Sequence, residues 1–325
     1  MTAARTARRA LAGALLAAFA AFAACEKTGD GAARHAAGDD GGTAPSAFVP
    51  KPAGALRLTI FELPVHGLAI AVETPAGALR FVDTGAKADE RSSGKEVLGP
   101  FVTASGAREI AGITISHPDR DHFEGARYLL KRFAVREFAD GLAADAKLAD
   151  DYVELREQAR SAGATVRMLR AGDVLDWDPA LEVTVLAPPT AGIATRRKDH
   201  ENDHSLVLRV RHGTQVFLLP GDIERAGAAS LLAAHPTATL RADVLVAPHH
   251  GFFDDAKFAA TVAPKHVVVS CQAEYADKEP REPGRLAEQL FGAVAAQGWV
   301  TAWDGTVTIT SDGANSTVTA SRPRR

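Results

Sequence analysis

Six residues, from His117 to His122, constrain the fold of this chain more than any other segment. They read H-P-D-R-D-H and follow the apolar run EIAGITIS, whose pattern predicts a buried strand. Two imidazoles and two carboxylates gathered at a strand end would repel one another or stay unpaired without a cation. Alternate positions past a strand point the same way, so His117, Asp119 and Asp121 can face one point, and His122 can turn back toward it from the start of a helix. The spacing therefore predicts a metal site, and a solvated acidic loop is the alternative.

Three other apolar runs also end in residue types that bind metals. LRFVDTG ends near Asp83, VFLLPGDIE near Asp222, and VLVAPHHG at His249 and His250. Taken alone, each has an ordinary structural explanation, such as an Asp-Gly turn or a surface histidine pair. Strand ends on one side of a sheet converge, however, and the active sites of α/β proteins usually lie there. The four segments together predict one shared pocket.

The rest of the pattern predicts strands and helices in alternation, with no linker inside residues 55–312. Strands are predicted over residues 55–61, 68–74, 79–83, 109–116, 165–169, 181–189, 242–251 and 265–271, with hairpins over 205–222 and 299–310. Helices are predicted over residues 124–133, 145–163, 223–235, 256–263 and 284–298. We therefore expect a single domain of layered α and β elements.

The first 25 residues predict export. Three arginines precede an apolar stretch, residues 10–24, that is too short for a comfortable membrane span and ends at Cys25. The sequence FAAC resembles a bacterial lipobox, with Phe22 where leucine is usual. On this interpretation residues 1–24 are a signal peptide, Cys25 carries lipid, and Glu26 favours the periplasmic face of the outer membrane. Ordinary cleavage that leaves a free or buried thiol is the alternative.

Composition limits the remaining segments. Residues 25–54 are rich in Gly, Ala and Asp and poor in large apolar side chains, which predicts a flexible tether. Residues 313–325 end in SRPRR and are predicted to be a solvated tail. Two cysteines are too few for a disulfide framework, and Cys271, at the end of HVVVSC, is predicted to be a buried apolar side chain. The net charge of −3 gives no sign of a polyanion-binding composition.

The order of these motifs resembles the metallo-β-lactamase superfamily. The motifs are Asp83, H-x-D-x-D-H at 117–122, Gly221-Asp222, and Pro248-His249-His250-Gly251. Residues 57–312 are similar to the hydrolase domain of the DNA-uptake protein ComEC and its stand-alone relatives. The resemblance implies a four-layer αββα sandwich, the metallo-β-lactamase fold, with a dinuclear metal site between its two sheets.

The resemblance also implies a role for each site residue. The implied metal ligands are His117 and Asp119 for the first metal, Asp121, His122 and His249 for the second, and Asp222 as a bridge. Asp83 would orient a ligand by hydrogen bonding. His250 is either a ligand or a proton donor to the leaving group. Catalysis is expected to depend on Asp121 and His250.

Three positions depart from the family pattern. The third histidine of the first metal should fall near ENDHS, where Asn202 matches the asparagine of ComEC-like sequences. His204 is an additional candidate, either as a ligand or in a loop hydrogen bond. The glycine-rich turn near the first strands reads PVHGLAI, with His66 predicted to be structural. The late Tyr-Gly-His-Pro is missing, since Tyr275 has no following histidine, and Lys278 is a candidate replacement.

The implied chemistry is hydrolysis. Two divalent metals about 3.5–4 Å apart can share a water and lower its pKa, giving hydroxide that attacks phosphorus or a carbonyl carbon. Histidine with carboxylate suits zinc, and a carboxylate-rich set also allows manganese. We expect hydrolysis of phosphodiester bonds outside the cytoplasm, with nucleic acid as a candidate substrate and Arg196, Arg197 and Lys198 as candidate phosphate contacts. The alternatives are a hydrolase of a lactone, β-lactam or thioester, and a non-catalytic metal-binding lipoprotein.

Overall fold

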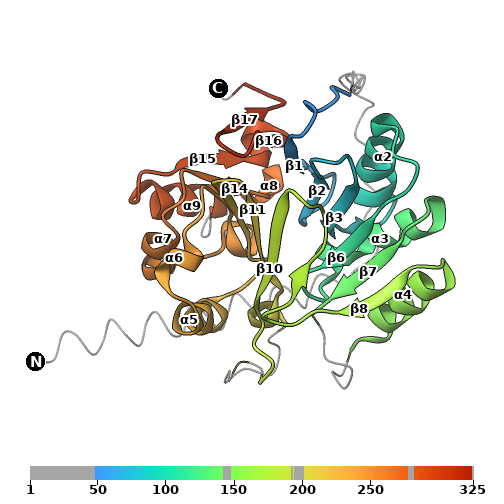
Figure 1. Ribbon diagram of the computed structural model, residues 1–325, viewed down its shortest axis with the longest axis horizontal. Helices are drawn as coiled ribbons and strands as arrows, with labels where there is room; N and C mark the ends of the chain where they lie inside the picture. The colour runs from blue at the N-terminus through green and yellow to red at the C-terminus, as the bar shows by residue number, and fades with distance from the viewer. Residues whose placement is uncertain (1–47, 142–147, 192, 194–200, 277–281, 324–325) are drawn as a thin grey trace, which may run out of the picture. The chain divides into compact units, whose positions relative to one another are not determined.

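Two β-sheets lie face to face at the centre of the fold, and helices cover both outer faces (Figure 1). The computed structural model describes residues 48–141, 148–191, 193, 201–276 and 282–323. The apolar runs of the sequence form the central strands of both sheets, as their patterns predicted.

The first sheet contains eight strands in the order β17-β16-β1-β2-β3-β6-β7-β8. These strands are β1 (Leu56–Ile60), β2 (Ala69–Glu73), β3 (Leu79–Thr84), β6 (Gly112–Ile115), β7 (Glu137–Asp140), β8 (Thr165–Met168), β16 (Val307–Ser311) and β17 (Ser316–Ala320). Strands β3, β6, β7 and β8 are parallel to one another, and the other pairs are antiparallel. The parallel half carries Asp83 and the residues that follow β6.

The second sheet contains seven strands in the order β15-β14-β13-β12-β11-β10-β9. They are β9 (Val174–Leu175), β10 (Leu181–Ala187), β11 (Val207–His212), β12 (Gln215–Leu219), β13 (Val244–Val246), β14 (His266–Val269) and β15 (Gln297–Val300). Strands β12 to β15 are parallel, so Asp222, which follows β12, and the histidines that follow β13 leave the sheet at the same edge. A separate two-stranded ribbon joins β4 (Lys87–Ala88) and β5 (Arg91–Ser92).

Two sets of helices flank the sheets. The helices beside the first sheet are α2 (Gly99–Ser105), which continues a π-helical turn at Gly94–Leu98, α3 (Arg120–Arg132) and α4 (Asp150–Ser161). Those beside the second are α5 (Arg225–Ala234), α6 (Thr237–Leu240), α7 (Ala256–Val262) and α9 (Pro283–Gly292). Two short helices, α8 (Ala273–Ala276) and α10 (Thr301–Asp304), adjoin α9.

Three apolar layers hold this arrangement together. The central layer joins the two sheets and includes Leu58 and Ile70 from the first and Phe217 from the second. The outer layers pack the helices onto the sheets, as with Phe123 on the first and Phe258 on the second. Alternate residues of β2 enter different layers, which explains its unbroken apolar run. The expected αββα sandwich is confirmed.

The predicted closing hairpin at residues 299–310 is wrong. Its first half belongs to β15 in the second sheet and its second half to β16 in the first, with α10 between them. Asp304 accepts a hydrogen bond from Val300 N at 2.7 Å, and Gly305 has φ 75, so the chain turns into a helix and crosses between sheets. Part of the predicted tail at 313–325 is also corrected, because β17 pairs with β16. This edge strand was not predicted because its residues are largely polar and half-exposed.

Several sequence predictions fall on segments outside the described residues. These are the signal peptide at 1–24, lipidated Cys25, most of the tether, Lys278, and the candidate phosphate contacts Arg196, Arg197 and Lys198. In the part of the chain that the structure describes, no helix is long and apolar enough to cross a membrane. Cys271 is 3% exposed, which confirms it as a buried side chain.

Candidate metal centre

Asp83 is the residue around which the centre is organised. It lies at the end of β3 with φ 57, an unusual backbone for a residue that is not glycine, and it is fully buried. Its Oδ1 accepts a hydrogen bond from Ser116 N at 2.7 Å, and its Oδ2 accepts one from Ser116 Oγ at 2.8 Å. Oδ2 also lies 2.8 Å from His122 Nδ1. Through these contacts Asp83 orients the segment that follows β6.

The imidazole rings of His122 and His250 both direct Nε2 toward the centre. His122 Nδ1 contacts the Asp83 carboxylate, and His250 Nδ1 lies 3.0 Å from the carbonyl oxygen of Ser270. Both partners only accept hydrogen bonds, so both Nδ1 atoms donate and both Nε2 atoms point inward. The Nε2 atoms lie 3.2 Å apart, and each is 3.3 Å from Asp222 Oδ2. An anchored Nδ1 and an inward Nε2 are the usual arrangement of metal-binding histidines.

His117 Nε2 and Asp222 Oδ1 are buried at the centre without a hydrogen bond to any described residue. His117 Nδ1 lies 3.0 Å from Ser116 Oγ, which already donates to Asp83, so Nδ1 donates and Nε2 keeps its lone pair. Both residues, His117 and Asp222, are at most 3% exposed. Unsatisfied buried polar atoms are costly, so this pair indicates a site for a cation.

Glycine lets the two sheets approach each other at the centre. Gly221, which precedes Asp222, has φ 57, and a Cβ there would lie 2.8 Å from Ser205 Cβ and 2.9 Å from Ser116 Cβ. A larger residue would therefore push the end of β12 away from the end of β6. Asp222 is fixed further by its backbone N–H, which donates to Ser205 Oγ at 3.1 Å.

Two groups of side chains in the described part of the chain could each hold a metal ion. They are His117 with His122 and Asp222, and His66 with Asp121 and His250, and the ligand atoms of each group lie within 4.8 Å of one another. Asp121 Oδ2 is 3.2 Å from His250 Nε2 and 3.9 Å from His122 Nε2. The two groups are therefore adjacent.

Carboxylates control the protonation of these histidines. Burial opposes charge on His122, but Asp222, Asp83 and Asp121 outweigh it and raise its pKa well above the usual value. Burial likewise opposes charge on His250, while Asp222 and Asp121 raise its pKa to about 10. The same contacts hold the pKa of Asp222 well below its usual range against the effect of burial. Without metal, protons on the two Nε2 atoms neutralise the carboxylates.

We expect zinc binding to release protons at neutral pH. Zinc must displace the Nε2 protons of His122 and His250, whose pKa values are raised, so about two protons should leave per chain. Because protons compete with the metal below these pKa values, affinity should rise with pH. Calorimetric titration of metal-free protein in buffers of different ionisation enthalpy measures this release. No proton release near pH 7 would contradict the prediction.

The structure brings His250, but not His249, into the metal-binding groups. His250, a candidate ligand or proton donor, lies in the cluster, whereas His249, the expected ligand, has Nδ1 3.6 Å from Glu224 Oε1. Burial lowers the pKa of His249. His249 and His250 have φ 48 and 53, a strained left-handed pair that costs of order 1–3 kcal/mol per residue. This backbone turn determines which of the two rings points inward.

The remaining predicted residues lie at or outside the edge of the cluster. Asp119 Oδ2 is 3.4 Å from His117 Nε2, and its side chain is 42% exposed. Asn202 Nδ2 donates to Glu224 Oε1 at 3.4 Å. His204 Nε2 accepts a hydrogen bond from Ile193 N at 3.1 Å, and His204 is in neither metal-binding group.

Sequence reasoning missed two residues of the centre, His66 and Ser116. His66 lies beside Asp121 and His250, and burial together with charge on His250 lowers its pKa to about 3. Its position in PVHGLAI, apart from any strand end, carried no metal-binding signal. Ser116 is adjacent to His117 in the sequence, but its link to Asp83 depends on the pairing of β3 with β6.

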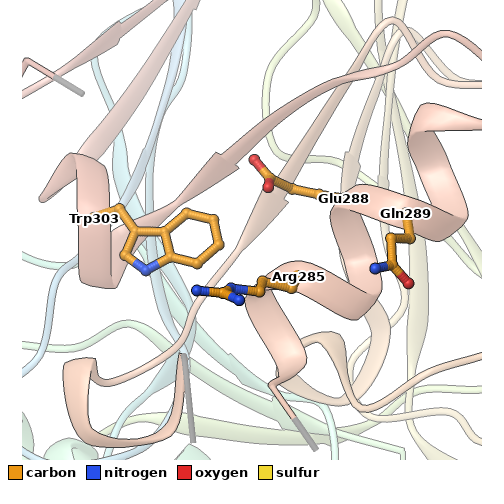
Figure 2. A pocket seen from close by; sticks show the side chains of 4 residues that line it. All are labelled: Arg285, Glu288, Gln289 and Trp303. Carbon is orange, nitrogen blue, oxygen red and sulfur yellow. The ribbon is translucent and has the colours of Figure 1, made fainter. Parts of the chain in front are cut away.

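A separate hollow lies beside α9 and α10. A pocket of about 530 Å³ is lined by Arg285, Glu288, Gln289 and Trp303. Figure 2 shows Arg285 extending from α9 toward Trp303. A second pocket of about 760 Å³ shares Glu288 and Trp303 with the first. Neither pocket is lined by members of the metal-binding groups, so the centre is identified by its chemistry and not by concavity.

One solved structure with a TM-score above 0.5 agrees with the layered architecture. A variant of the CmlA β-hydroxylase matches with a TM-score of 0.51 and 13% identity, covering 80% of this chain and 54% of that one. The metallo-β-lactamase fold protein YhfI from Bacillus subtilis matches with a TM-score of 0.48 and 10% identity, covering 75% and 96%. The chain has the metallo-β-lactamase fold.

The chain is also similar in sequence to two proteins of the competence machinery, over part of their length. It is 31% identical over 183 residues to ComE operon protein 3 of Bacillus subtilis (strain 168), covering 55% of this chain and 22% of the relative. It is 28% identical over 219 residues to Competence protein ComA of Neisseria gonorrhoeae, covering 67% of this chain and 27% of the relative. The chain thus spans about a quarter of the length of these relatives. No protein-family model matches it.

Proposed function

We propose that the chain is a hydrolase that holds two divalent cations and cleaves phosphodiester bonds. One observation carries this proposal: buried imidazole and carboxylate groups from both sheets converge, and His117 Nε2 and Asp222 Oδ1 have no hydrogen-bond partner among the described residues. Burying charged and polar groups without partners is unfavourable, and bound cations would offset this cost.

The side chains present fit such cations. Histidine nitrogen and carboxylate oxygen are the common ligands of zinc, and manganese accepts the same set when oxygen predominates. His117, His122 and Asp222 would hold one cation. Asp121 and His250 would contribute to the other, with Asp222 between them. This arrangement differs from the implied one, in which His122 binds the same metal as Asp121.

When bound, two divalent cations supply Lewis acidity and make water nucleophilic near neutral pH. The chain's own residues provide the orientation that this chemistry requires. Asp83 and the carbonyl of Ser270 keep the protons of His122 and His250 on Nδ1. Asp119 would meet the entering substrate, because it is the most exposed of the predicted ligands of the H-x-D-x-D-H motif.

Similarity to ComE operon protein 3 and Competence protein ComA supports the choice of phosphodiesters as the proposed substrate class. Nucleic acid is therefore the first substrate to test. We also propose that the protein acts outside the cytoplasm, anchored through lipid on Cys25. That proposal depends on residues 1–25 alone.

A substrate panel run with zinc and with manganese tests the proposed activity. We expect the protein from residue 26 onward to bind about two metals and to hydrolyse bis-p-nitrophenyl phosphate and single-stranded DNA. Nitrocefin and lactones should remain intact. Hydrolysis of a lactone or β-lactam alone would favour a carbonyl substrate. Bound metal without turnover on any substrate would favour a non-catalytic metal-binding protein.

A further inference from the structure

We propose that His66 is a ligand of the second cation, together with Asp121 and His250. The inference rests on the proposed metal binding and adds a residue from the loop between β1 and β2, a segment without the metal-binding motifs of the strand ends. Without His66, Asp121 and His250 would share that cation with Asp222 alone.

The distances bring His66 within reach of a shared cation. A nitrogen of His66, one of His250 and an oxygen of Asp121 lie within 4.8 Å of one another. His66 Nε2 is 3.8 Å from Asp121 Oδ2, and His250 Nε2 is 3.2 Å from the same oxygen. Two ligands about 2.0–2.1 Å from a tetrahedral zinc lie roughly 3.3 Å apart, so a small movement of the ring suffices.

The loop that carries His66 is tied to both neighbouring ligands. The Leu68 backbone N–H donates to Asp121 O at 3.1 Å, and Ser270 Oγ donates to Gly67 O at 2.9 Å. Ser270 also accepts the Nδ1 proton of His250. The residues on each side of the proposed cation are therefore linked through the backbone, which positions His66 before any metal binds.

Gly67 makes this close approach possible. Its φ is 146, and a Cβ there would lie 2.3 Å from the carbonyl oxygen of Asp121. Any side chain at this position would push the loop, and His66 with it, away from the start of α3. Glycine at this position thus allows His66 to lie close to Asp121.

The ring of His66 is held between two others. Its centroid lies 4.3 Å from that of His250 and 5.1 Å from that of Tyr275, which meets it edge-on from α8. Its Nδ1 is buried and lacks a hydrogen-bond partner among the described residues. No hydrogen bond to a described residue thus fixes the ring through Nδ1, and Nε2, 3.8 Å from Asp121 Oδ2, is the nitrogen that would reach the cation.

Metal binding by His66→Gln tests the proposal without relying on activity. We expect one of two zinc ions to bind at least about tenfold more weakly in competition with a chromogenic chelator, with the other unchanged. The absorption spectrum of the cobalt-loaded protein should change, because one nitrogen ligand is lost. The control is His266→Gln, at the far end of β14 from Ser270, which should match the wild type in both measurements.

A second variant separates ligation from a packing role. In His66→Ala, added imidazole should restore the lost affinity and the wild-type cobalt spectrum, since the His66 side chain is 25% exposed and its site is open to solvent. Wild-type affinity and an unchanged cobalt spectrum in His66→Gln would overturn the role of His66 while leaving the proposed function intact. Failure of the wild-type protein to bind two metals would overturn both.

Discussion

Asp222→Asn should abolish most of the proposed hydrolysis, with a loss of about 10³-fold or more, while the fold remains intact. Asp222 Oδ2 is 3.3 Å from the Nε2 atoms of both His122 and His250, and Oδ1 is buried without a hydrogen bond to any residue that the structure describes. Asparagine has nearly the same volume but lacks the negative charge with which Asp222 would help to hold cations. We therefore expect the loss of at least one bound metal together with the loss of activity.

Metal content and phosphodiester hydrolysis measure this effect, and circular dichroism checks the fold. The matched control is Asp254→Asn, since Asp254 pairs with Arg225 on the surface and its side chain is 66% exposed. The control should keep wild-type metal content and rate. An Asp222→Asn protein with two metals and more than a tenth of the wild-type rate would refute the assignment of Asp222.

Asp83→Asn should weaken zinc binding by about 10- to 100-fold and lower the free energy of unfolding of the metal-free protein by about 1–3 kcal/mol. Asp83 accepts from Ser116 N, Ser116 Oγ and His122 Nδ1. Asparagine has only one acceptor oxygen, and its NH₂ group would face at least one of these donors. The His122 ring would lose the contact that keeps Nε2 directed at the centre.

The backbone does not complicate this prediction, because asparagine adopts the left-handed region at least as readily as aspartate. Asp89 supplies a matched control. It is exposed and has φ 50, so Asp89→Asn makes the same change on the same backbone away from the centre. Chelator competition and urea unfolding of the metal-free proteins compare the two variants. Equal zinc affinity in Asp83→Asn and Asp89→Asn would contradict the orienting role of Asp83.

The structure confirmed the strands that were predicted from continuous runs of apolar residues. The apolar runs over residues 55–61, 68–74 and 79–83 became β1, β2 and β3, because strands covered on both faces consist mostly of apolar residues. The predicted closing hairpin was wrong because it required knowledge of which strands pair. Residues 299–310 alternate like two paired strands, but β15 pairs with β14 in the second sheet, and β16 pairs with β1 and β17 in the first. Local pattern carries no information about such partners.

The sequence by itself determined that imidazoles and carboxylates stand at the ends of buried strands, since residue type and strand period are local properties. It also determined that Asp83 ends β3, where an orienting role was expected. Only the tertiary structure decided that His250 and not His249 faces the cluster, and that His66 joins Asp121. The direction of a ring depends on left-handed backbone at 249–250, and the position of His66 depends on contacts between loops distant in the sequence. Neither is visible until the chain has folded.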